Sequence, residues 1–514
     1  MTKETLSANN SETGQKSYRE LIKDKLLVPG IENYFHYDEK GHLWVGDLRI
    51  VDAVALYGTP LKIFDMTVVE TRCQQWQELT EKAAKKVGYQ GGFEYFYATK
   101  ANPMVELLET VIQSGWGIET SSAQDLDNLH WLVRNGRVDV KKIKVICNGF
   151  KLPPQYLGNP SVPETVRSKV IFDTDPRTID YTEQHSYAEY ICLLRLLGVN
   201  IEPMLDSGEI NFFGQRNEIP EMEVGLRMKF GQVKNDSELE KLVSRHGMSW
   251  EKIQQNAQRI DKIPHLHLTT LHAMVGAAEI IPVETFIDCL TFAAEKYFIL
   301  KRNHPELTGL DIGGGIPPMS SNYDYEKLLT LFLSKVKKLA EKEGSTEPKI
   351  IFELGSFVAS EAAMNVVKVI QFKINGADKW AIINSGLMAD IPDILMIKKK
   401  FDVIAANNAN NPAEEVIIGD ITCDHDGRYP TIEMGGKVLI PHTDLGNNWP
   451  LIIVFNDTGA YQDALSGEGG AHHCLLPEEG SLFIRRKNGK VHTNFIARQT
   501  SSELRQLLGY SNST

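Results

Sequence analysis

Lys100 directly follows an aromatic and β-branched run, Phe93 to Thr99, that is typical of a buried strand. Turn and helix-start residues, Ala101-Asn102-Pro103, come next. A lysine at the end of a strand, in a mostly apolar pocket, loses its proton more readily than one in water, because desolvation disfavours the charged form. A neutral amine can condense with an aldehyde, so Lys100 is a candidate Schiff-base lysine. The stretch by itself also fits a lysine that caps the strand with a solvated charge.

Other residues with chemical potential follow further strand-like runs. Glu353 and Gly355 follow the run Lys349 to Phe352, and the triplet Gly313 to Gly315 follows Leu310 to Ile312. Glycines after a strand let backbone N–H groups approach a phosphate closely, although a glycine triplet is also the usual composition of a tight turn. A carboxylate between apolar residues at a strand end is either a placed acid or an ordinary surface charge. The sequence has no GxxxxGK[ST] motif, so it does not support a nucleotide-binding P-loop.

A second group of polar residues lies nearer the C-terminus. The stretch Thr422 to Gly427 combines groups that can bind a cation or move a proton, among them Cys423, Asp424 and Asp426. A polar turn with an inert cysteine has the same composition. Tyr461, after two small residues, offers a hydroxyl that a phosphate could use or the core could bury.

Metal ligands are not predicted. The six cysteines form no CxxC pair and no zinc spacing, which suits a reducing compartment. His472 and His473 beside Cys474 resemble metal ligands, but adjacent histidines point in different directions on most backbones.

The composition narrows the class of protein. The chain has 514 residues, of which 42% are hydrophobic and 24% charged, as expected for a soluble globular protein of two or more domains. Its formal net charge of −12 argues against a nucleic-acid binder, which needs a basic surface. No apolar run approaches the roughly 18 residues that span a bilayer, and the polar segment Met1 to Gln15 lacks the hydrophobic core of a secretory signal. We therefore expect a cytoplasmic protein that binds neither nucleic acid nor membrane.

The elements that position these residues alternate along most of the chain. From about residue 64 to residue 365, strand-like runs alternate with amphipathic helical patterns, which indicates βα units and a parallel sheet. So many units over ~300 residues fit a closed (β/α)8 barrel better than an open sheet, and a barrel carries its functional residues at the C-terminal ends of its strands. The expected parts are a flexible tail (1–20), N-terminal strands that join the β-rich domain (21–63), the barrel (64–365) and a C-terminal β-rich domain (366–514).

Two regions within the barrel need particular interpretations. The apolar runs Lys169 to Phe172 and Tyr190 to Leu194 are interpreted as strands. Pro203 and Pro220 interrupt residues 196–222, which we interpret as an insertion or long loop.

Five ordered motifs resemble those of the fold-type III pyridoxal-phosphate (PLP) decarboxylases, which pair an alanine-racemase-like barrel with a β-rich domain. The motifs are Tyr97-Ala98-Thr99-Lys100-Ala101-Asn102, Gly313-Gly314-Gly315, Glu353-Leu354-Gly355, Cys423-Asp424 and Gly459-Ala460-Tyr461. The resemblance runs from about residue 55 to the C-terminus, and the order of the motifs is more specific than any one of them. Those most similar to biosynthetic arginine decarboxylase are Ile146 to Lys151, Asp420 to Gly427, Gly459 to Gln462 and Leu507 to Tyr510. The lysine motif looks more like that of diaminopimelate decarboxylase.

The resemblance implies a role for each motif. Lys100 would hold PLP covalently, Glu353 would pair with its pyridine nitrogen, and Cys423 would return a proton to the α-carbon after CO2 leaves. Asp424 and Asp426 would bind the distal cationic end of the substrate. In this family the cysteine and aspartate come from the partner protomer, so the resemblance implies a homodimer with shared sites. The other residues that would contact the cofactor are His272, Met274, Gly276, Gly313, Gly314, Gly315, Gly355 and Tyr461.

The chain departs from the family pattern at positions that contact the cofactor. Relatives carry a His-x-His-x-Gly-Ser stretch, whose second histidine stacks on the ring and whose serine binds phosphate; here Met274 and Ala277 take those two positions. Methionine can pack on an aromatic ring but donates no hydrogen bond. A shifted alignment that lets His272 stack is also open. Ser356 stands where relatives have an arginine, which removes a cation near phosphate or carboxylate.

The implied function is PLP-dependent decarboxylation of a basic amino acid to an amine and CO2, with arginine as the expected substrate and polyamine biosynthesis as the expected context. Alternatives are decarboxylation of diaminopimelate, ornithine or lysine, and a catalytically impaired homologue that regulates a true decarboxylase. A racemase on the same fold would need a tyrosine base opposite Lys100, and Cys423 takes the reprotonating position instead.

Overall fold

The computed structural model describes residues 16–151, 187–229, 246–276, 281–444, 450–467, 469–487 and 490–510. Eight parallel strands close into a barrel, in which β12 pairs with β5 and β9 pairs with β10. This barrel, with the β-rich region beside it, confirms the predicted fold class. The barrel strands are β5 (Phe93–Ala98), β6 (Gly117–Thr120), β7 (Lys144–Cys147), β8 (Asn200–Leu205), β9 (Met222–Arg227), β10 (Leu266–His272), β11 (Gly309–Asp311) and β12 (Lys349–Leu354).

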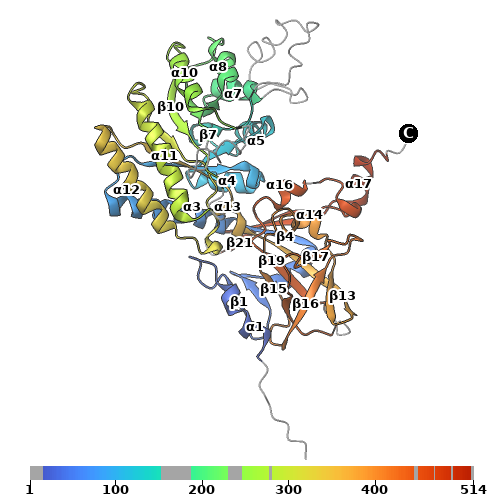
Figure 1. Ribbon diagram of the computed structural model, residues 1–514. Coiled ribbons are helices and arrows are strands. Elements are labelled where there is room, and N and C mark those ends of the chain that lie inside the picture. Colours follow the sequence, from blue (N-terminus) through green and yellow to red (C-terminus); the bar gives the residue numbers. More distant parts are fainter. Residues whose placement is uncertain are drawn as a thin grey trace, which may run out of the picture.

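Amphipathic helices surround the barrel (Figure 1). Two of the long helices, α3 and α12, each begin after an aspartate that accepts a hydrogen bond from the helix backbone. Each ends at a glycine in the left-handed region (φ 70° at Gly88, 58° at Gly344). Their apolar faces point to the core: α12 buries Leu328, Phe332 and Val336 at helical spacing. The helices are α3 (Met66–Val87), α4 (Val105–Gln113), α5 (Ala123–Arg134), α7 (Tyr187–Leu196), α8 (Ser207–Gly214), α10 (Trp250–Ile260), α11 (Val283–Lys301), α12 (Tyr325–Glu343) and α13 (Ser356–Ala359).

Large apolar side chains fill the lower part of the barrel. Phe96, Ile146, Met204 and Ile351 form a cluster separate from the main core. Glycine on a neighbouring strand provides the room: a Cβ at Gly117 would lie 2.4 Å from the Phe96 ring. The barrel is therefore packed rather than hollow, and polar groups gather at the C-terminal ends of its strands.

The C-terminal part forms a 10-stranded sheet around the path β17-β16-β14-β13-β4-β20-β21. β4 precedes the barrel in sequence but pairs with β13 and β20. Figure 1 shows β4 in blue among the strands of the C-terminal part. The strands are β4 (Leu61–Asp65), β13 (Ala363–Asn375), β14 (Asp378–Ile383), β15 (Val403–Ala405), β16 (Ala413–Gly419), β17 (Arg428–Tyr429), β18 (Val438–Pro441), β19 (Ile452–Asn456), β20 (Gly480–Lys487) and β21 (Lys490–Ile496). The short helices are α14 (Leu387–Asp390), α15 (Asp393–Met396), α16 (Gln462–Ser466) and α17 (Ser501–Leu507).

The N-terminal segment packs against this sheet. The backbone N–H of Leu43 donates to the carbonyl oxygen of Ala406 (2.9 Å), and Tyr18 is fully buried. The prediction of a flexible tail over residues 1–20 is therefore wrong for its last residues, which are packed. Residues 1–15 lie outside the described residues. The elements of this segment are α1 (Tyr18–Leu21), β1 (Phe35–Tyr37), β2 (Leu43–Val45), β3 (Leu48–Arg49) and α2 (Ile50–Tyr57).

Residues 196–222 are not an insertion, because they contain β8 and α8 of the barrel. Pro203 lies within β8, where its missing N–H masks the strand signal although the strand pairs on both sides. Asp206 then caps α8, since its side chain accepts hydrogen bonds from the N–H groups of Gly208 and Glu209.

Tyr190 to Leu194, predicted as a strand, lies in α7. All five side chains of this run are buried, and an apolar run buried on all sides carries no period that separates strand from helix. The strand predicted for Lys169 to Phe172 lies outside the described residues.

A buried lysine connects β4 to two later segments of the chain. Lys62 Nζ lies 2.6 Å from Asp463 Oδ1 and 2.7 Å from Glu478 Oε1, and 2% of its side chain is exposed. His472 Nε2 lies 2.7 Å from the other oxygen of Glu478. Although burial opposes it, the hydrogen bond from His472 and the charge of Lys62 lower the pKa of Glu478 to about 2. The network fixes α16, whose preceding residue, Tyr461, reaches the barrel.

We predict that Lys62→Met lowers the free energy of unfolding by about 3–5 kcal/mol, because two buried carboxylates lose their shared cation. Lys144→Met is the control: it removes an ion pair with Glu94 in which half of the lysine side chain is exposed, and should cost less than about 1 kcal/mol. Urea unfolding followed by circular dichroism measures both.

The Lys62 effect should also depend on pH. Because the folded-state pKa of Glu478 lies below its ordinary value of 4.5, the stabilisation is complete above that value and is lost as the pH falls toward about 2. The difference between wild type and Lys62→Met should therefore shrink over this range. Equal losses of unfolding free energy in Lys62→Met and Lys144→Met would contradict a stabilising role of Lys62. A difference between wild type and Lys62→Met that does not change with pH would contradict the part of Glu478 in it.

Candidate active site

A cavity of about 260 Å³ opens at the C-terminal ends of the barrel strands. Residues of the barrel line it together with residues of the C-terminal part, among them Tyr461. Seven residues that the resemblance assigns to the cofactor meet there: Lys100, Met274, Gly314, Gly315, Glu353, Gly355 and Tyr461.

Lys100 lies in the short 3-10 turn Thr99–Ala101 that follows β5. Its Nζ is 3.5 Å from Glu119 Oε2; half of the lysine side chain is exposed, and Glu119 is fully buried. The Glu119 carboxylate raises the pKa of Lys100 against the lowering effect of burial, and Glu353 raises it further. The prediction that this amine loses its proton readily is therefore wrong for this arrangement, because a buried carboxylate that the sequence did not reveal outweighs desolvation.

Asn148 connects two buried carboxylates beside the lysine. Its Nδ2 donates to Glu353 Oε1 (2.7 Å) and to Glu119 Oε1 (3.1 Å). Burial and the charge of Glu119 raise the pKa of Glu353 to about 7. Glu353 can therefore hold or release a proton near neutral pH, a property that is common in catalytic acids.

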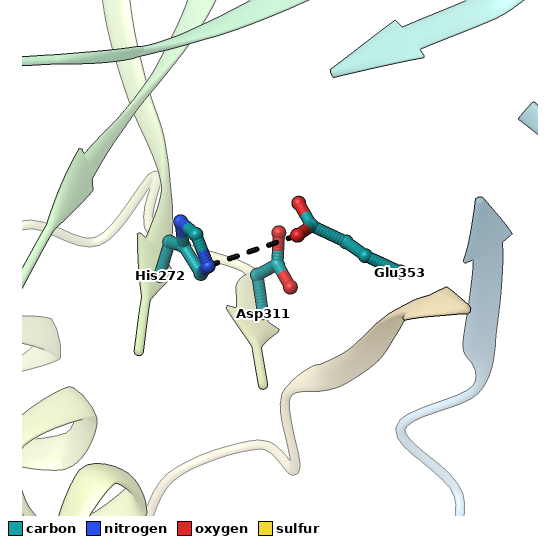
Figure 2. A group of neighbouring side chains, drawn as sticks. All are labelled: His272, Asp311 and Glu353. Atoms are coloured by element: carbon teal, nitrogen blue, oxygen red, sulfur yellow. Dashed lines mark ion pairs between the residues drawn. The ribbon is translucent and has the colours of Figure 1, made fainter. Parts of the chain in front are cut away.

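Figure 2 shows His272, Asp311 and Glu353 converging from the ends of β10, β11 and β12. His272 Nε2 lies 3.8 Å from Glu353 Oε2. Burial and the charge of Glu353 raise the pKa of Asp311 well above its usual range, and burial lowers that of His272 well below its own. Neither ring nitrogen of His272 has a hydrogen-bond partner within the described ranges. Buried polar atoms without partners are unfavourable, so these nitrogens mark a place for a polar ligand or water.

The same three residues also offer donor atoms to a metal. One donor atom from each lies within 4.8 Å of the others, and imidazole with carboxylates suits a divalent cation. The sequence predicted no metal ligands here. Glu353 lines the cavity together with Lys100. Its carboxylate can therefore bind either a metal ion or the ring of a cofactor beside Lys100, but not both at once.

Met274 is the residue from the end of β10 that lines the cavity. Its Sδ accepts a hydrogen bond from the Gly314 N–H (3.3 Å), and a Cβ at Gly313 would lie 2.6 Å from the same sulfur. His272 lies deeper, with 1% of its surface exposed. Met274 lines the cavity and His272 does not, while the residue that stacks on the cofactor ring stays a prediction. Gly276 follows with φ 125°, and Ala277 lies outside the described residues.

The glycine-rich wall of the cavity has no room for side chains. A Cβ at Gly314 would lie 2.2 Å from the carbonyl oxygen of Glu353, and Gly313 and Gly315 have φ of 68° and 85°, a region that favours glycine. A Cβ at Gly355 would lie 2.9 Å from the Ala101 Cβ. Backbone at such a wall can approach an anion such as phosphate closely.

Tyr461 and Ser356 complete this side of the cavity. The Tyr461 N–H donates to the carbonyl oxygen of Ala101 (2.6 Å), which joins the C-terminal part to the lysine turn. Burial raises the pKa of Tyr461 and a hydrogen bond with Ser356 lowers it, with burial the larger effect. The tyrosine hydroxyl therefore stays protonated and can donate. Ser356, at the start of α13, offers a hydroxyl at the position where the resemblance implies an arginine.

Cys423, Asp424 and Asp426 lie in the loop between β16 and β17. Within the described chain, none of them lines the cavity that contains Lys100. Asp424 Oδ2 lies 3.0 Å from His473 Nε2, while Cys423 and Asp426 are exposed. A single chain therefore does not bring this loop to the cavity, and the shared-site arrangement remains a prediction.

The sequence analysis missed three charged residues at strand ends. Asp311 is the last residue of β11, Arg227 is the last residue of β9, and Glu119 is the next to last residue of β6. Their signal is a charged residue at the end of a short apolar run, which also occurs on ordinary surfaces. Arg227 lines a second cavity of about 430 Å³, together with Asn148 and Lys151. Because Asn148 also donates to Glu353, this basic cavity adjoins the first one.

Comparison with known proteins finds similarity to decarboxylases. Residues 166–360 match the family model described as the pyridoxal-binding domain of pyridoxal-dependent decarboxylases. Biosynthetic arginine decarboxylase of Thermosynechococcus vestitus is 22% identical over 74% of this chain and 58% of its own length. Diaminopimelate decarboxylase of Vibrio cholerae is 22% identical over 69% of this chain and 74% of its own length.

The fold is similar to that of a solved structure, biosynthetic arginine decarboxylase SpeA from Campylobacter jejuni, with a TM-score of 0.73 and 16% identity over 93% of this chain and 91% of that one. This chain is therefore similar to pyridoxal-dependent decarboxylases, in sequence over residues 166–360 and in its fold. It spans little more than half the length of the arginine decarboxylases it matches, 58% in the example above.

PLP is the cofactor that this family implies, and the residues of the cavity fit it. An amine (Lys100), an acid whose pKa is near neutral (Glu353) and a wall of bare glycine backbone line one cavity. These are the groups that an aldehyde, a ring nitrogen and a phosphate need.

Glu353→Gln tests the buried acid in protein freed of cofactor with hydroxylamine. The folded state raises the pKa of Glu353 from 4.5 to about 7. The stability that protonated Glu353 contributes to the folded protein is therefore complete below pH 4.5 and is lost as the pH rises through about 7. Relative to wild type, the free energy of unfolding of Glu353→Gln should therefore rise by up to about 3 kcal/mol as the pH increases from about 5 to about 8. Urea unfolding at both pH values measures this change. Glu415→Gln, at an exposed position, is the control, and parallel pH curves for wild type and Glu353→Gln would refute the assignment.

Proposed function

We propose that this protein is a PLP-dependent decarboxylase of a basic amino acid, with arginine as its substrate. The observation that carries this proposal is that Lys100 and Glu353 line one cavity whose glycine-rich wall suits a phosphate. The match to a pyridoxal-binding domain supports the cofactor, and the arginine decarboxylases among the relatives support the substrate.

Each residue of the cavity would hold one part of the cofactor. Lys100 would bind the aldehyde carbon, Glu353 would face the ring nitrogen, and Gly314, Gly315 and Tyr461 would hold the phosphate. When bound, the cofactor supplies an electron sink for the pair of electrons that CO2 leaves behind.

The residues of the chain itself control protons and orientation. Glu119 holds the Lys100 amine charged at 3.5 Å, so the amine needs a proton acceptor before it can attack a carbonyl. Asn148 keeps the Glu353 carboxylate in place through a 2.7 Å hydrogen bond. Met274 contributes a polarisable, apolar surface to the cavity, which suits packing on a ring.

Substrate recognition in this proposal uses the loop of a second chain. Cys423 would return the proton to the α-carbon, and Asp424 and Asp426 would meet the cationic end of the substrate, as the resemblance implies. Because one chain does not place these residues at its own cavity, we propose a homodimer with shared sites.

Diaminopimelate is the second candidate substrate. The match to the Vibrio cholerae diaminopimelate decarboxylase covers 74% of that enzyme, against 58% of the arginine enzyme. The basic cavity beside the site, which Arg227, Lys229 and Lys252 line, offers cations that an additional carboxylate would need. Ornithine and lysine are further candidates, and Met274 with Ser356 supports a catalytically impaired regulatory homologue as another.

We propose a cytoplasmic location. In the described portion of the chain, no helix combines the length and apolarity required to cross a membrane.

The test is incubation of the purified protein and PLP with arginine, ornithine, lysine or diaminopimelate, with measurement of CO2 and of the amine product. We expect release of CO2 and agmatine from arginine, at least about a hundredfold loss in Lys100→Ala, and unchanged turnover in the control Lys144→Ala. Lys144 is half exposed and lies at the opposite end of its strand from the cavity. CO2 from diaminopimelate alone would support the second candidate. Turnover of none would refute the enzymatic proposal, and loss of optical rotation without CO2 would indicate a racemase.

A further inference from the structure

Two exposed cysteines meet outside the cavity. Cys423 Sγ lies 3.8 Å from Cys474 Sγ, although the residues are 51 positions apart in the sequence. Both thiols are exposed, whereas the four other cysteines, Cys73, Cys147, Cys192 and Cys289, are buried. The accessible thiols of the chain are thus the two that touch.

The two segments are held together by more than this contact. His473 Nε2 lies 3.0 Å from Asp424 Oδ2, which pairs the neighbours of the two cysteines. Both segments also pack against Gly386: a Cβ there would lie 2.6 Å from Leu476 Cδ1 and 3.6 Å from Thr422 Cγ2. The proximity of the sulfurs therefore follows from the packing of their backbones.

The backbone at Cys474 is unusual. Cys474 and Leu475 have φ of 56° and 55°, in the left-handed region that residues with a Cβ rarely adopt. Two consecutive residues in this region are unfavourable unless the surrounding contacts impose them, and such conformations concentrate at functional sites. Here they turn the Cys474 thiol toward Cys423.

We propose that Cys423 and Cys474 form a reversible disulfide, and that this redox modification switches the enzyme off. Formation of the disulfide rests on the geometry alone. Its effect rests on the proposed function, in which Cys423 returns a proton to the substrate, because a sulfur in a disulfide has no proton to give.

The chemistry requires an external oxidant, and a small-molecule disulfide, oxidised glutathione, suffices. One cysteine thiolate attacks a glutathione sulfur, forms a mixed disulfide and releases one glutathione thiolate. The second cysteine then attacks the protein sulfur, forms the Cys423–Cys474 bond and releases the second glutathione. The two cysteine protons and two electrons end on the two glutathione molecules. The sulfurs must approach from 3.8 Å to about 2.0 Å, which rotation of exposed side chains can provide.

The state of Cys423 before oxidation agrees with this role. Its contact with Cys474 raises the pKa of Cys423, so the sulfur carries its proton at neutral pH. A protonated thiol is the form that a proton donor needs. A cysteine thiol keeps its proton at neutral pH without this contact as well, so reduced Cys474 is not required for the donor, whereas the disulfide blocks it.

The experiment incubates the holoenzyme with oxidised glutathione or with dithiothreitol, alkylates free thiols, and maps the peptides by mass spectrometry without reduction. CO2 release is measured on the same samples. We expect a peptide pair joined through Cys423 and Cys474, about a hundredfold less CO2 release in the oxidised sample, and recovery of both thiols and activity with dithiothreitol.

Cys474→Ser is the matched variant. It should keep wild-type CO2 release under dithiothreitol, because Cys474 does not line the cavity that contains Lys100 and has no role in the proposed reaction. With oxidised glutathione it should show a mixed disulfide on Cys423 in place of the joined peptides. Absence of the joined peptides in wild type would overturn the disulfide, and joined peptides with unchanged CO2 release would overturn the switch. Joined peptides in a protein that releases no CO2 even when reduced would refute the proposed function and the switch, but not the disulfide.

Discussion

The burial of carboxylates at the mouth of the barrel is the constraint on which the site depends. Glu119, Asp311 and Glu353 are almost fully buried within a few residues of strand ends that converge there. Buried carboxylates are stable only when they are paired, hydrogen-bonded or protonated. The barrel meets this need in different ways: Lys100 pairs with Glu119, Asn148 joins two of the acids, and the raised pKa of Glu353 lets it keep a proton. A ligand with a basic ring nitrogen and an aldehyde complements these groups.

The position of the reactive amine depends equally on the C-terminal part. The Tyr461 N–H binds the carbonyl oxygen of Ala101, and Asn102 Nδ2 donates to the Gly459 carbonyl oxygen (3.2 Å) and to Asp463 Oδ2 (3.3 Å). Asp463 in turn pairs with Lys62 of β4. The residues that flank Lys100 are therefore fixed from both parts of the fold, and the cavity exists only where the two meet.

Periodicity was sufficient to predict the barrel and the β-rich part, because βα alternation leaves a clear pattern. It failed where no periodic signal is present. Pro203 interrupts the strand pattern of β8, and the apolar run in α7 is buried on all sides. Motifs predicted the residues of the cavity, since Lys100 and Glu353 end strands that pair side by side. The direction of the Lys100 pKa shift could not be predicted, because it depends on Glu119, which only the pairing of β6 beside β5 brings near. The packing of Cys423 against Cys474 has the same origin, in contacts between distant segments.

The most direct test of the central claim is to incubate the protein with PLP, reduce it with borohydride, digest it and locate the pyridoxyl group by mass spectrometry. We predict that the label lies on Lys100 and is lost in Lys100→Ala. Lys399 also lines the cavity and is the internal control. A label on Lys399 or on another lysine, or no label at all, would contradict the assignment of Lys100 as the residue that binds the cofactor.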